Sequence, residues 1–295
     1  MIARLAPAKV NLHLRVLRRR EDGYHDIATL LQQISLYDEL EFSPRRRGIA
    51  LRCPDGTLPE NRDNIVFRAA ETLLSRAACR AGIEITIRKR IPIAAGLGGG
   101  SSDAATTLMA INDIFSLGFS PDELMRIGAT LGADVPFFIF GTCAWAFGIG
   151  DRLKKPEKSP PPLWFVLLNP PLQIPTKAVY EKLNLRLTNE GINYSIPRFC
   201  TVGDIAGELH NDLEEVALNI HPNLQHLKDL LLRHGALGTL MSGSGPTVFG
   251  IFAEEEDARR TAAALRGSGP WSVFTARSLQ RTIPCPELGN SLLSE

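Results

Sequence analysis

The stretch Ile91–Phe115 reads IPIAAGLGGGSSDAATTLMAINDIF, and it places four glycines between positions 96 and 100, directly before a segment with helical periodicity. An ordered glycine costs roughly 0.5–1 kcal/mol of backbone entropy relative to alanine, so such a dense cluster needs a physical reason. A tight turn needs fewer glycines. Bare backbone at the start of a helix, with the hydroxyls of Ser101 and Ser102 beside it, is typical of a site that binds an anion such as phosphate.

Two common phosphate-binding loops do not fit this stretch. A Walker A loop requires G-x-x-x-x-G-K-[ST], and no Gly-Lys pair occurs in the chain. A dinucleotide-binding loop requires G-x-G-x-x-G, but the sixth residue counted from Gly96 is Ser101, and from Gly98 it is Asp103. The chain also lacks the D-F-G triplet of protein kinases. A phosphate loop of another kind and a tight strand-to-helix turn therefore both stay open until the neighbouring motifs are considered.

The segments upstream of the loop predict an antiparallel start. Residues 10–16 alternate apolar and polar side chains, which indicates a half-buried strand. Asp22-Gly23 supplies a turn, and the extended run Tyr24–Ile34 predicts the second strand of a hairpin. Helical spacing then covers Asn64–Ala77, and alternation in Ile83–Lys89 predicts a strand that leads into the glycine loop.

A helix is predicted after the glycine loop, with Ser101 or Ser102 as its N-cap and Asp103 in its first turn. One face of this helix is apolar and consists of Ala104, Ala105, Leu108, Ile111 and Phe115. The order of elements around the loop is thus strand, glycine loop, helix.

The second half of the chain also mixes strands and helices. Charge and proline combine in residues 154–162 (KKPEKSPPP), which predicts a linker with a domain boundary near Pro160. The predicted domains are 1–159 and 160–283, followed by a tail, 284–295, expected to be poorly ordered. The segments LWFVLLN and LGTLMSGSGPTVFGIF predict strands, and Asn223–Arg233 and Glu254–Leu265 predict helices.

Composition excludes several classes of function. The chain has 295 residues, 44% of them hydrophobic and 22% charged, which is typical of a soluble protein of about two domains. Its formal net charge is +1, and the basic runs Arg18–Arg20 and Arg45–Arg47 are short, so nucleic acid is not an expected partner. The uncharged stretches Val135–Gly150 and Ser159–Thr176 are too short or too rich in proline to cross a membrane.

Cysteine usage indicates a reducing compartment. The five cysteines are far apart in the sequence and form no C-x-x-C pair, which fits neither a disulfide framework nor a zinc site. The N-terminus lacks the apolar core of a signal peptide, so a cytoplasmic location is expected. A monomer and a homodimer both fit these observations.

Three segments together resemble the motifs of the GHMP kinase superfamily of small-molecule kinases. They are LAPAKVNLHL (residues 5–14), PIAAGLGGGSSDAA (92–105) and LMSGSGPTVFGIF (240–252), and they occur in the order and at the spacing of that superfamily. The resemblance covers most of the chain. It implies an α+β fold of two domains: an N-terminal domain like domain 2 of ribosomal protein S5 and a C-terminal ferredoxin-like domain, with the active site in the cleft between them.

The resemblance also implies ATP as phosphoryl donor, together with Mg²⁺. A magnesium ligand is not identified by the sequence, although Ser101 or Ser102 is a candidate. The residues expected to bind ATP are Asn64, Lys89, Gly96, Leu97, Gly98, Gly99, Gly100, Ser101 and Ser102.

The expected catalytic pair is Lys9 and Asp134. Catalysis of phosphoryl transfer consists mostly of positioning and electrostatic stabilisation. By the family match, Asp134 accepts the proton of the attacking hydroxyl and Lys9 neutralises charge at the reacting centre. Asp134 stands in GADVPFF, where Pro136 favours an extended conformation for Val135, so we expect the carboxylate at a bend.

Two further segments, REDGYHDIATLLQ (residues 20–32) and LGADVPFF (131–138), resemble one branch of the superfamily. That branch phosphorylates a hydroxyl of a polyol linked to cytidine diphosphate, in the non-mevalonate route to isoprenoid precursors. A partner with a cytidine diphosphate group is therefore expected. The expected substrate-binding residues are Asn11, Tyr24, His25, Thr176, Tyr180, Gly243, Ser244 and Gly245.

Other functions stay open at this point. The superfamily also contains kinases of homoserine, mevalonate and sugars, and members that bind ATP or sugar as sensors without turnover. A sensor has no need for Lys9 and Asp134, so their presence favours an enzyme. The D-G-Y-H segment, together with Thr176 and Tyr180, favours the cytidine diphosphate branch over the other kinases.

Overall fold

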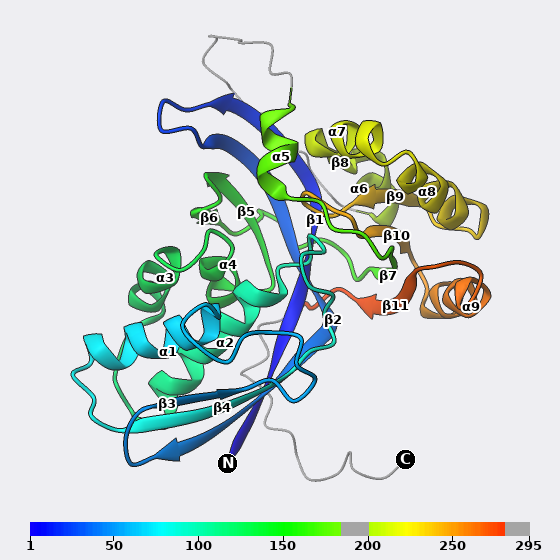
Figure 1. The fold of residues 1–295 in the computed structure, drawn as a ribbon. Coiled ribbons are helices and arrows are strands. Elements are labelled where there is room, and N and C mark those ends of the chain that lie inside the picture. Colours follow the sequence, from blue (N-terminus) through cyan, green and yellow to red (C-terminus); the bar gives the residue numbers. More distant parts are fainter. Residues whose placement is uncertain (184–200, 281–295) are drawn as a thin grey trace.

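The structure, a computed structural model, describes residues 1–183 and 201–280. Within them the strands form a seven-stranded and a four-stranded sheet, with helices packed against both (Figure 1). The strands of the larger sheet are β1 (Ile2–Arg19), β2 (His25–Arg45), β3 (Ile49–Arg52), β4 (Gly82–Arg88), β5 (Cys143–Gly148), β6 (Arg152–Lys154) and β8 (His210–Asn211). Those of the smaller sheet are β7 (Trp164–Asn169), β9 (Gly238–Met241), β10 (Val248–Phe252) and β11 (Ser272–Arg277). The α+β class expected from the sequence is confirmed.

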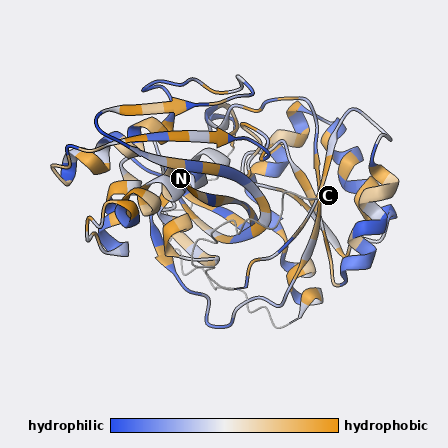
Figure 2. Ribbon diagram, turned by 90° about the horizontal axis from the view of Figure 1, so that it is seen from below, coloured by the Kyte–Doolittle hydropathy of each residue, from blue (hydrophilic) through white to orange (hydrophobic). Residues whose placement is uncertain are grey.

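Helices α1–α4 accompany the larger sheet, and α5–α9 follow in the second half of the chain. Their bounds are α1 (Ile65–Arg76), α2 (Gly99–Ile114), α3 (Pro121–Ala129), α4 (Val135–Phe140), α5 (Thr176–Glu181), α6 (Val202–Glu208), α7 (Asp212–Ile220), α8 (Asn223–Arg233) and α9 (Glu255–Leu265). Many of these helices carry hydrophobic and hydrophilic residues on different sides (Figure 2), as expected where one side packs on a sheet.

The hairpin β1–β2 is the backbone of the larger sheet. It pairs antiparallel over its whole length, and the predicted turn contains Gly23 with a φ of 85°. The prediction of a half-buried first strand is wrong, however. Asn11 and His13, on the face opposite Val10 and Leu12, are each only 3% exposed. Both faces of β1 are covered, so a simple alternation of apolar and polar residues does not report its burial.

The larger sheet buries one apolar core under helices α1, α2 and α4. Asn64 caps α1, because its side-chain oxygen accepts a hydrogen bond from the Val66 amide at 3.0 Å. The core side chains come from the apolar sides of these helices and from β2 and β4, and they include Phe42, Leu73, Ile85, Leu108 and Phe137. This core fixes α2, and with it the glycine loop, against the sheet.

The smaller sheet has the strand order β11-β7-β10-β9, and all its pairs are antiparallel. In chain order it runs as strand, helices, two strands, helix, strand, which is the β-α-β-β-α-β pattern of ferredoxin-like domains. The C-terminal expectation is therefore confirmed, including the predicted helices that correspond to α8 and α9. These two helices pack on the strands of this sheet.

The two sheets share a second apolar core between them. Val10, Leu12 and Trp145 from the larger sheet pack with Phe165 and Phe249 from the smaller one. Strand β8, from the second half of the chain, pairs in parallel with β1 of the first. The predicted boundary near Pro160 falls between β6 and β7 and stays a prediction, and the predicted tail 284–295 lies outside the described residues.

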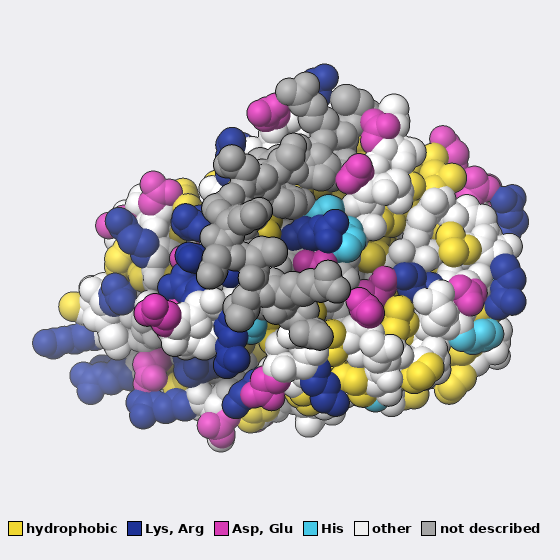
Figure 3. Space-filling model, turned by 90° about the horizontal axis from the view of Figure 1, so that it is seen from above, with side chains coloured by type: hydrophobic (Ala, Val, Ile, Leu, Met, Phe, Trp, Pro, Cys, Tyr) yellow, Lys and Arg dark blue, Asp and Glu magenta, His cyan; other side chains and the backbone are white. Residues whose placement is uncertain are grey.

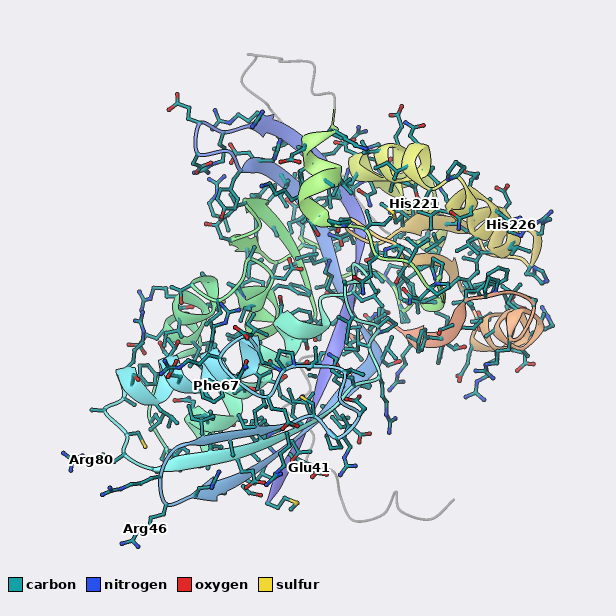
Figure 4. All side chains as sticks on the ribbon, viewed as in Figure 1. Glu41, Arg46, Phe67, Arg80, His221 and His226 are labelled. Carbon is teal, nitrogen blue, oxygen red and sulfur yellow. The ribbon has the colours of Figure 1, made fainter. Side chains whose placement is uncertain are left out.

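The molecule's surface has basic side chains near the end formed by the larger sheet (Figure 3). Arg46, from the short basic run after β2, and Arg80 lie at that end and point outward (Figure 4). His221 and His226 lie at the opposite end, on the helices of the smaller sheet. Over the described ranges, no helix combines the length and apolar character needed to span a membrane.

Candidate active site

A cavity of about 1180 Å³ lies where the glycine loop, the β1–β2 hairpin and the C-terminal half meet. It gathers residues that are far apart in the sequence. The predicted site residues that line it are Lys9, Asn11, Tyr24, His25, Gly96, Gly98, Ser101, Asp134, Thr176, Tyr180, Gly243 and Ser244. The structure thus brings both members of the expected catalytic pair and most of the expected substrate-binding residues into one space.

Lys9 occupies the centre of this arrangement. Its Nζ lies 3.6 Å from a carboxylate oxygen of Asp134, and it donates hydrogen bonds to Asn11 Oδ1 at 2.7 Å and to the Gly96 carbonyl at 3.0 Å. The Lys9 side chain is 6% exposed and that of Asp134 is 37% exposed. A buried cation therefore faces a carboxylate that is open to the cavity, beside the glycine loop.

Asp134 is placed by a helix start and not by an extended bend. It is the N-cap of α4 with φ −82° and ψ −12°, and Val135 is already the first helical residue. The expectation that Pro136 keeps Val135 extended is wrong, because proline is tolerated in the first turn of a helix, where its missing N–H has no partner to lose. The carboxylate makes no capping bond and so stays free to face Lys9.

The loop needs glycines because atoms of neighbouring residues leave no room for side chains there. A Cβ on Gly96, whose φ is +77°, would lie 2.0 Å from the Ser242 carbonyl oxygen. A Cβ on Gly98, whose φ is +70°, would lie 3.0 Å from both Lys9 Cγ and Phe138 Cζ. The Leu97 carbonyl accepts a hydrogen bond from the Lys9 amide at 2.9 Å. These glycines therefore let the loop lie directly on Lys9 and on the C-terminal half.

Helix α2 begins earlier than predicted. Gly98 is its N-cap in the left-handed conformation, Gly99 is its first residue, and no side chain caps it. The prediction of Ser101 or Ser102 as N-cap is wrong, as is Asp103 in the first turn, because the glycines themselves make the turn into the helix. Ser101 lines the cavity, whereas Ser102 is fully buried and its hydroxyl has no hydrogen-bond partner among the described residues.

The third motif closes the cavity from the C-terminal half. Ser242 Oγ donates to the Gly96 carbonyl at 2.9 Å, which ties this motif to the glycine loop. Asn211, the last residue of β8 and the N-cap of α7, donates to the carbonyls of Met241 and Gly243 at 2.8 Å each. Gly243 has φ +55° and lines the cavity, but Gly245 does not line it. Asn211 and Ser242 were not predicted, and no sequence pattern marks a hydrogen bond across such a separation.

Aromatic rings gather at the far end of the cavity. His25 and Tyr180 stack with ring centroids 5.0 Å apart and an interplanar angle of 28°, while Tyr24 is 62% exposed beside them. Burial, together with the charge of Asp134, raises the pKa of Tyr180 to about 12, so its hydroxyl is a hydrogen-bond donor. Burial and the nearby Arg19 lower the pKa of His25, which favours the neutral ring.

Thr176 joins this end of the cavity to the third motif. Its hydroxyl lies 2.8 Å from the hydroxyl of Ser244, and both residues line the cavity. Basic side chains also reach this end, since Arg19 and Lys177 line it. A cavity with an aromatic end and nearby cations suits a ligand that combines a flat base with anionic groups.

Two residues expected to bind ATP have other partners in the structure. The side-chain oxygen of Asn64 caps α1, and its side-chain nitrogen donates to the Pro59 carbonyl at 3.0 Å. Lys89 is buried between the carboxylates of Asp38 and Asp103. Neither residue lines the cavity, and Leu97, Gly99, Gly100 and Ser102 do not line it either.

The chain matches two family models. The model for the GHMP kinases N-terminal domain matches residues 64–142, and the model for the GHMP kinases C-terminal region matches residues 196–270. The first match contains the glycine loop and Asp134, and the second contains the third motif. This chain belongs to the GHMP kinase family.

Several curated relatives of this GHMP kinase carry the same name. It is 62% identical over 279 residues to the 4-diphosphocytidyl-2-C-methyl-D-erythritol kinase of Syntrophus aciditrophicus (strain SB), a match that covers 95% of this chain and all of the relative. It is 51% identical to the kinase of the same name from Syntrophotalea carbinolica, over 92% of this chain and 96% of that one. A crystal structure of 4-(cytidine 5'-diphospho)-2C-methyl-D-erythritol kinase has a TM-score of 0.79 at 39% identity, and the match covers 93% of this chain and 99% of that one.

Two further kinases of known structure share the fold at lower identity. A homoserine kinase from Cytophaga hutchinsonii has a TM-score of 0.70 at 20% identity, over 95% of each chain. A mevalonate kinase has a TM-score of 0.69 at 17% identity, over 94% of this chain and 99% of that one. These two similarities show the common fold alone. The family and the two-domain α+β fold expected from the sequence are thus confirmed.

Proposed function

We propose that this GHMP kinase transfers the γ-phosphoryl group of ATP, bound with Mg²⁺, to the 2-hydroxyl of 4-diphosphocytidyl-2-C-methyl-D-erythritol, in the non-mevalonate route to isoprenoid precursors. The names and high identity of the curated relatives support this choice of substrate. The observation that carries the proposal is the placement of the Lys9–Asp134 pair in one cavity, with the glycine loop beside it and the aromatic pair of His25 and Tyr180 farther along.

In the proposed reaction the acceptor oxygen attacks the γ-phosphorus while the bond to the β–γ bridging oxygen breaks, and ADP leaves. Asp134 accepts the proton of the attacking hydroxyl. Lys9 neutralises charge at the reacting centre, and its bonds to Asn11 and to the Gly96 carbonyl keep its ammonium in place. Since the transition state of phosphoryl transfer is loose, this fixed placement of charge is the main contribution expected of the protein.

The glycine loop and α2 form the proposed phosphate site. No side chain caps the backbone N–H groups at the start of α2, and the positive end of the helix favours anions. Of the two serines considered as magnesium ligands, Ser101 is the better candidate, because it lines the cavity while Ser102 is fully buried. Magnesium enters with ATP as part of that substrate.

The aromatic end is the proposed cytosine site. Tyr24 and Tyr180 would stack on the base, and His25 would read its edge, with Thr176 and Ser244 near the rest of the acceptor. A neutral histidine has one donor and one acceptor nitrogen, so it can accept from the exocyclic amine of cytosine or donate to its ring nitrogen. The stacked rings of His25 and Tyr180 would have to separate for a base to stack on the same face of Tyr180.

The proposed compartment is the cytoplasm. Cys53, Cys79 and Cys143 are free thiols in the structure, in keeping with reducing conditions. Cys200 and Cys285 lie outside the described residues.

Competition among acceptors tests the function. ADP release is measured with 4-diphosphocytidyl-2-C-methyl-D-erythritol, its uridine analogue, homoserine, mevalonate and galactose. We expect turnover with the cytidine compound and a far poorer reaction with the uridine compound, because uracil would leave buried groups of the site mispaired. The uridine penalty should shrink in His25→Ala. Equal rates with cytidine and uridine compounds would refute base recognition by His25, and turnover of another acceptor alone would refute the proposed substrate.

A further inference from the structure

A buried ion triad lies beneath the start of α2. The ammonium of Lys89, the residue that follows β4, contacts Asp38 Oδ2 and lies 2.8 Å from Asp103 Oδ2. The side chains of Lys89, Asp38 and Asp103 are 7%, 0% and 1% exposed. Three charged side chains from β2, from the end of β4 and from α2 therefore meet out of contact with solvent.

Asp38 connects this triad to the segment that leads into the glycine loop. Its second oxygen, Oδ1, accepts hydrogen bonds from the amides of Arg90 at 2.6 Å and Ile91 at 2.9 Å. Both oxygens of Asp38 thus have partners, and the backbone just after Lys89 is fixed to β2. This is the point from which the chain runs to Gly96.

Asp103 connects the triad to the other side of the glycine loop. It lies on α2, and only its Oδ2 is paired; Oδ1 is buried without a hydrogen-bond partner among the described residues. A Cβ added to Gly99, the first residue of α2, would lie 3.3 Å from Lys89 Nζ and 3.0 Å from Ile91 Cγ2. Lys89 therefore packs directly against the first turn of the helix.

These contacts leave Lys89 poorly placed to bind a ligand in the cavity. Its ammonium is engaged by two carboxylates, its side chain is buried, and it does not line the cavity. We infer that Lys89 is a positioning residue for the nucleotide site: with Asp38 and Asp103 it clamps the segment before the glycine loop to the helix after it, and so holds the loop in the shape that binds phosphate. This inference rests on the proposed binding of ATP at that loop.

The charge balance of the triad agrees with this role. The two carboxylates raise the pKa of Lys89 despite its burial, so the lysine keeps its charge. Burial raises the pKa of Asp103, the carboxylate with the unpaired oxygen. Buried ion groups are often no more stabilising than apolar residues of similar size, so a triad at this place is better explained by the geometry it imposes on the loop.

The inference is tested by measuring the affinity of the Asp103→Leu variant for ATP, which does not require the acceptor substrate. Leucine has a similar branched shape, and its introduction leaves the Lys89–Asp38 pair in charge balance, so the fold should survive. We expect the Kd for ATP, measured by calorimetry, to rise about tenfold or more, as for loss of a hydrogen bond between charged groups. Asp103→Asn, which can still accept a hydrogen bond from Lys89, should stay within about threefold of the parent.

Thr107→Val is the matched control on the same helix. Thr107 is fully buried and donates to the backbone carbonyl of Asp103 at 2.8 Å, so Thr107→Val perturbs α2 at this point and removes no side-chain contact of the triad. If the weaker ATP binding came only from a destabilised helix, Thr107→Val would raise the Kd for ATP as much as Asp103→Leu at equal loss of stability. That result would overturn the inference.

Lys89→Met combined with Asp103→Leu separates positioning from direct contact. If Lys89 acts through Asp103, the double variant should bind ATP no more weakly than Asp103→Leu alone, within about twofold, because coupled groups are not additive. A further large loss in the double variant would mean that Lys89 contacts the nucleotide itself. Unchanged ATP affinity in Asp103→Leu would also overturn the inference, whether or not the parent phosphorylates the proposed acceptor.

Discussion

The Lys9 ammonium lies 3.6 Å from the Asp134 carboxylate, although Lys9 comes from the middle of β1 and Asp134 from the start of α4. This separation is longer than a direct hydrogen bond, and the Lys9 ammonium instead donates hydrogen bonds to Asn11 Oδ1 and to the Gly96 carbonyl. Asp134 therefore keeps its oxygens available to the cavity while a cation stands beside it. This arrangement is compatible with the general-base role proposed for Asp134.

Asp134→Asn should lower turnover by about 10²- to 10⁴-fold, the range typical of the loss of a general base. Asparagine keeps the shape of the side chain but cannot accept the proton. Because Asp134 makes no capping bond to α4, folding should change little. Steady-state kinetics and calorimetry with both ligands check this. Turnover within a few-fold of the parent, in folded protein, would remove Asp134 from its assigned role.

Gly98→Ala should lower kcat by more than its loss of stability accounts for. Both Gly98 and Gly118 have positive φ, so alanine at either should destabilise the fold by about 1 kcal/mol or more. Only at Gly98 does the added carbon crowd Lys9 and Phe138; nothing lies within 4 Å of it at Gly118. We therefore expect kcat to fall about tenfold or more in Gly98→Ala, because a displacement of Lys9 misplaces its charge, and to stay near the parent in Gly118→Ala.

The Gly98 comparison is read by urea unfolding and by kcat measured on the same preparations. Similar kcat in the two alanine variants, at similar loss of stability, would show that the approach of Gly98 to Lys9 has no part in catalysis.

Tyr180→Ala should weaken binding of the acceptor and leave binding of ATP unchanged. Stacking of an aromatic side chain on a base contributes about 1–3 kcal/mol, so the Kd of the cytidine acceptor should rise about fivefold to a hundredfold while the Kd of ATP stays the same. Tyr24→Ala should act in the same direction. Tyr180→Phe keeps the ring and separates stacking from the hydroxyl. Calorimetry with each ligand measures these values, and a parallel loss of ATP affinity would indicate a damaged fold instead of a lost stacking contact.

Asp103→Asn should become relatively more stable as pH rises. Burial raises the pKa of Asp103 to about 7 in the folded protein, above its ordinary value near 3.8. The folded state therefore holds a proton that the unfolded state releases, and the stability from this group is present at low pH and lost as pH rises toward about 7. Asparagine does not ionise, so the free energy of unfolding of the variant relative to the parent should be higher at about pH 8 than at about pH 5.

Urea unfolding at both pH values measures that difference, and Asp113→Asn, exposed on the same helix, controls for the general loss of a carboxylate. A pH-independent difference between Asp103→Asn and the parent would contradict a buried Asp103 that changes its protonation in this range.

Structural features that depend on a few neighbouring residues could be predicted from the sequence. The hairpin around Gly23, the strand before the glycine loop and helices α1, α8 and α9 lie where periodicity and turn residues indicated. The three family motifs correctly predicted the family and its two-domain fold. The details of the loop were less predictable, because Gly98 and not a serine starts α2.

The tertiary structure decided which of those residues share a space. Lys9, Asp134 and Gly96 meet only because α4 and the glycine loop pack against the sheet that contains β1. Ser242 reaches Gly96 only because the two sheets share a core. Lys89 was expected near the nucleotide from the family resemblance, yet its ammonium is buried between the carboxylates of Asp38 and Asp103. Periodicity and turn preferences act between neighbours along the chain, whereas such pairings depend on packing between distant segments, and no local pattern records them.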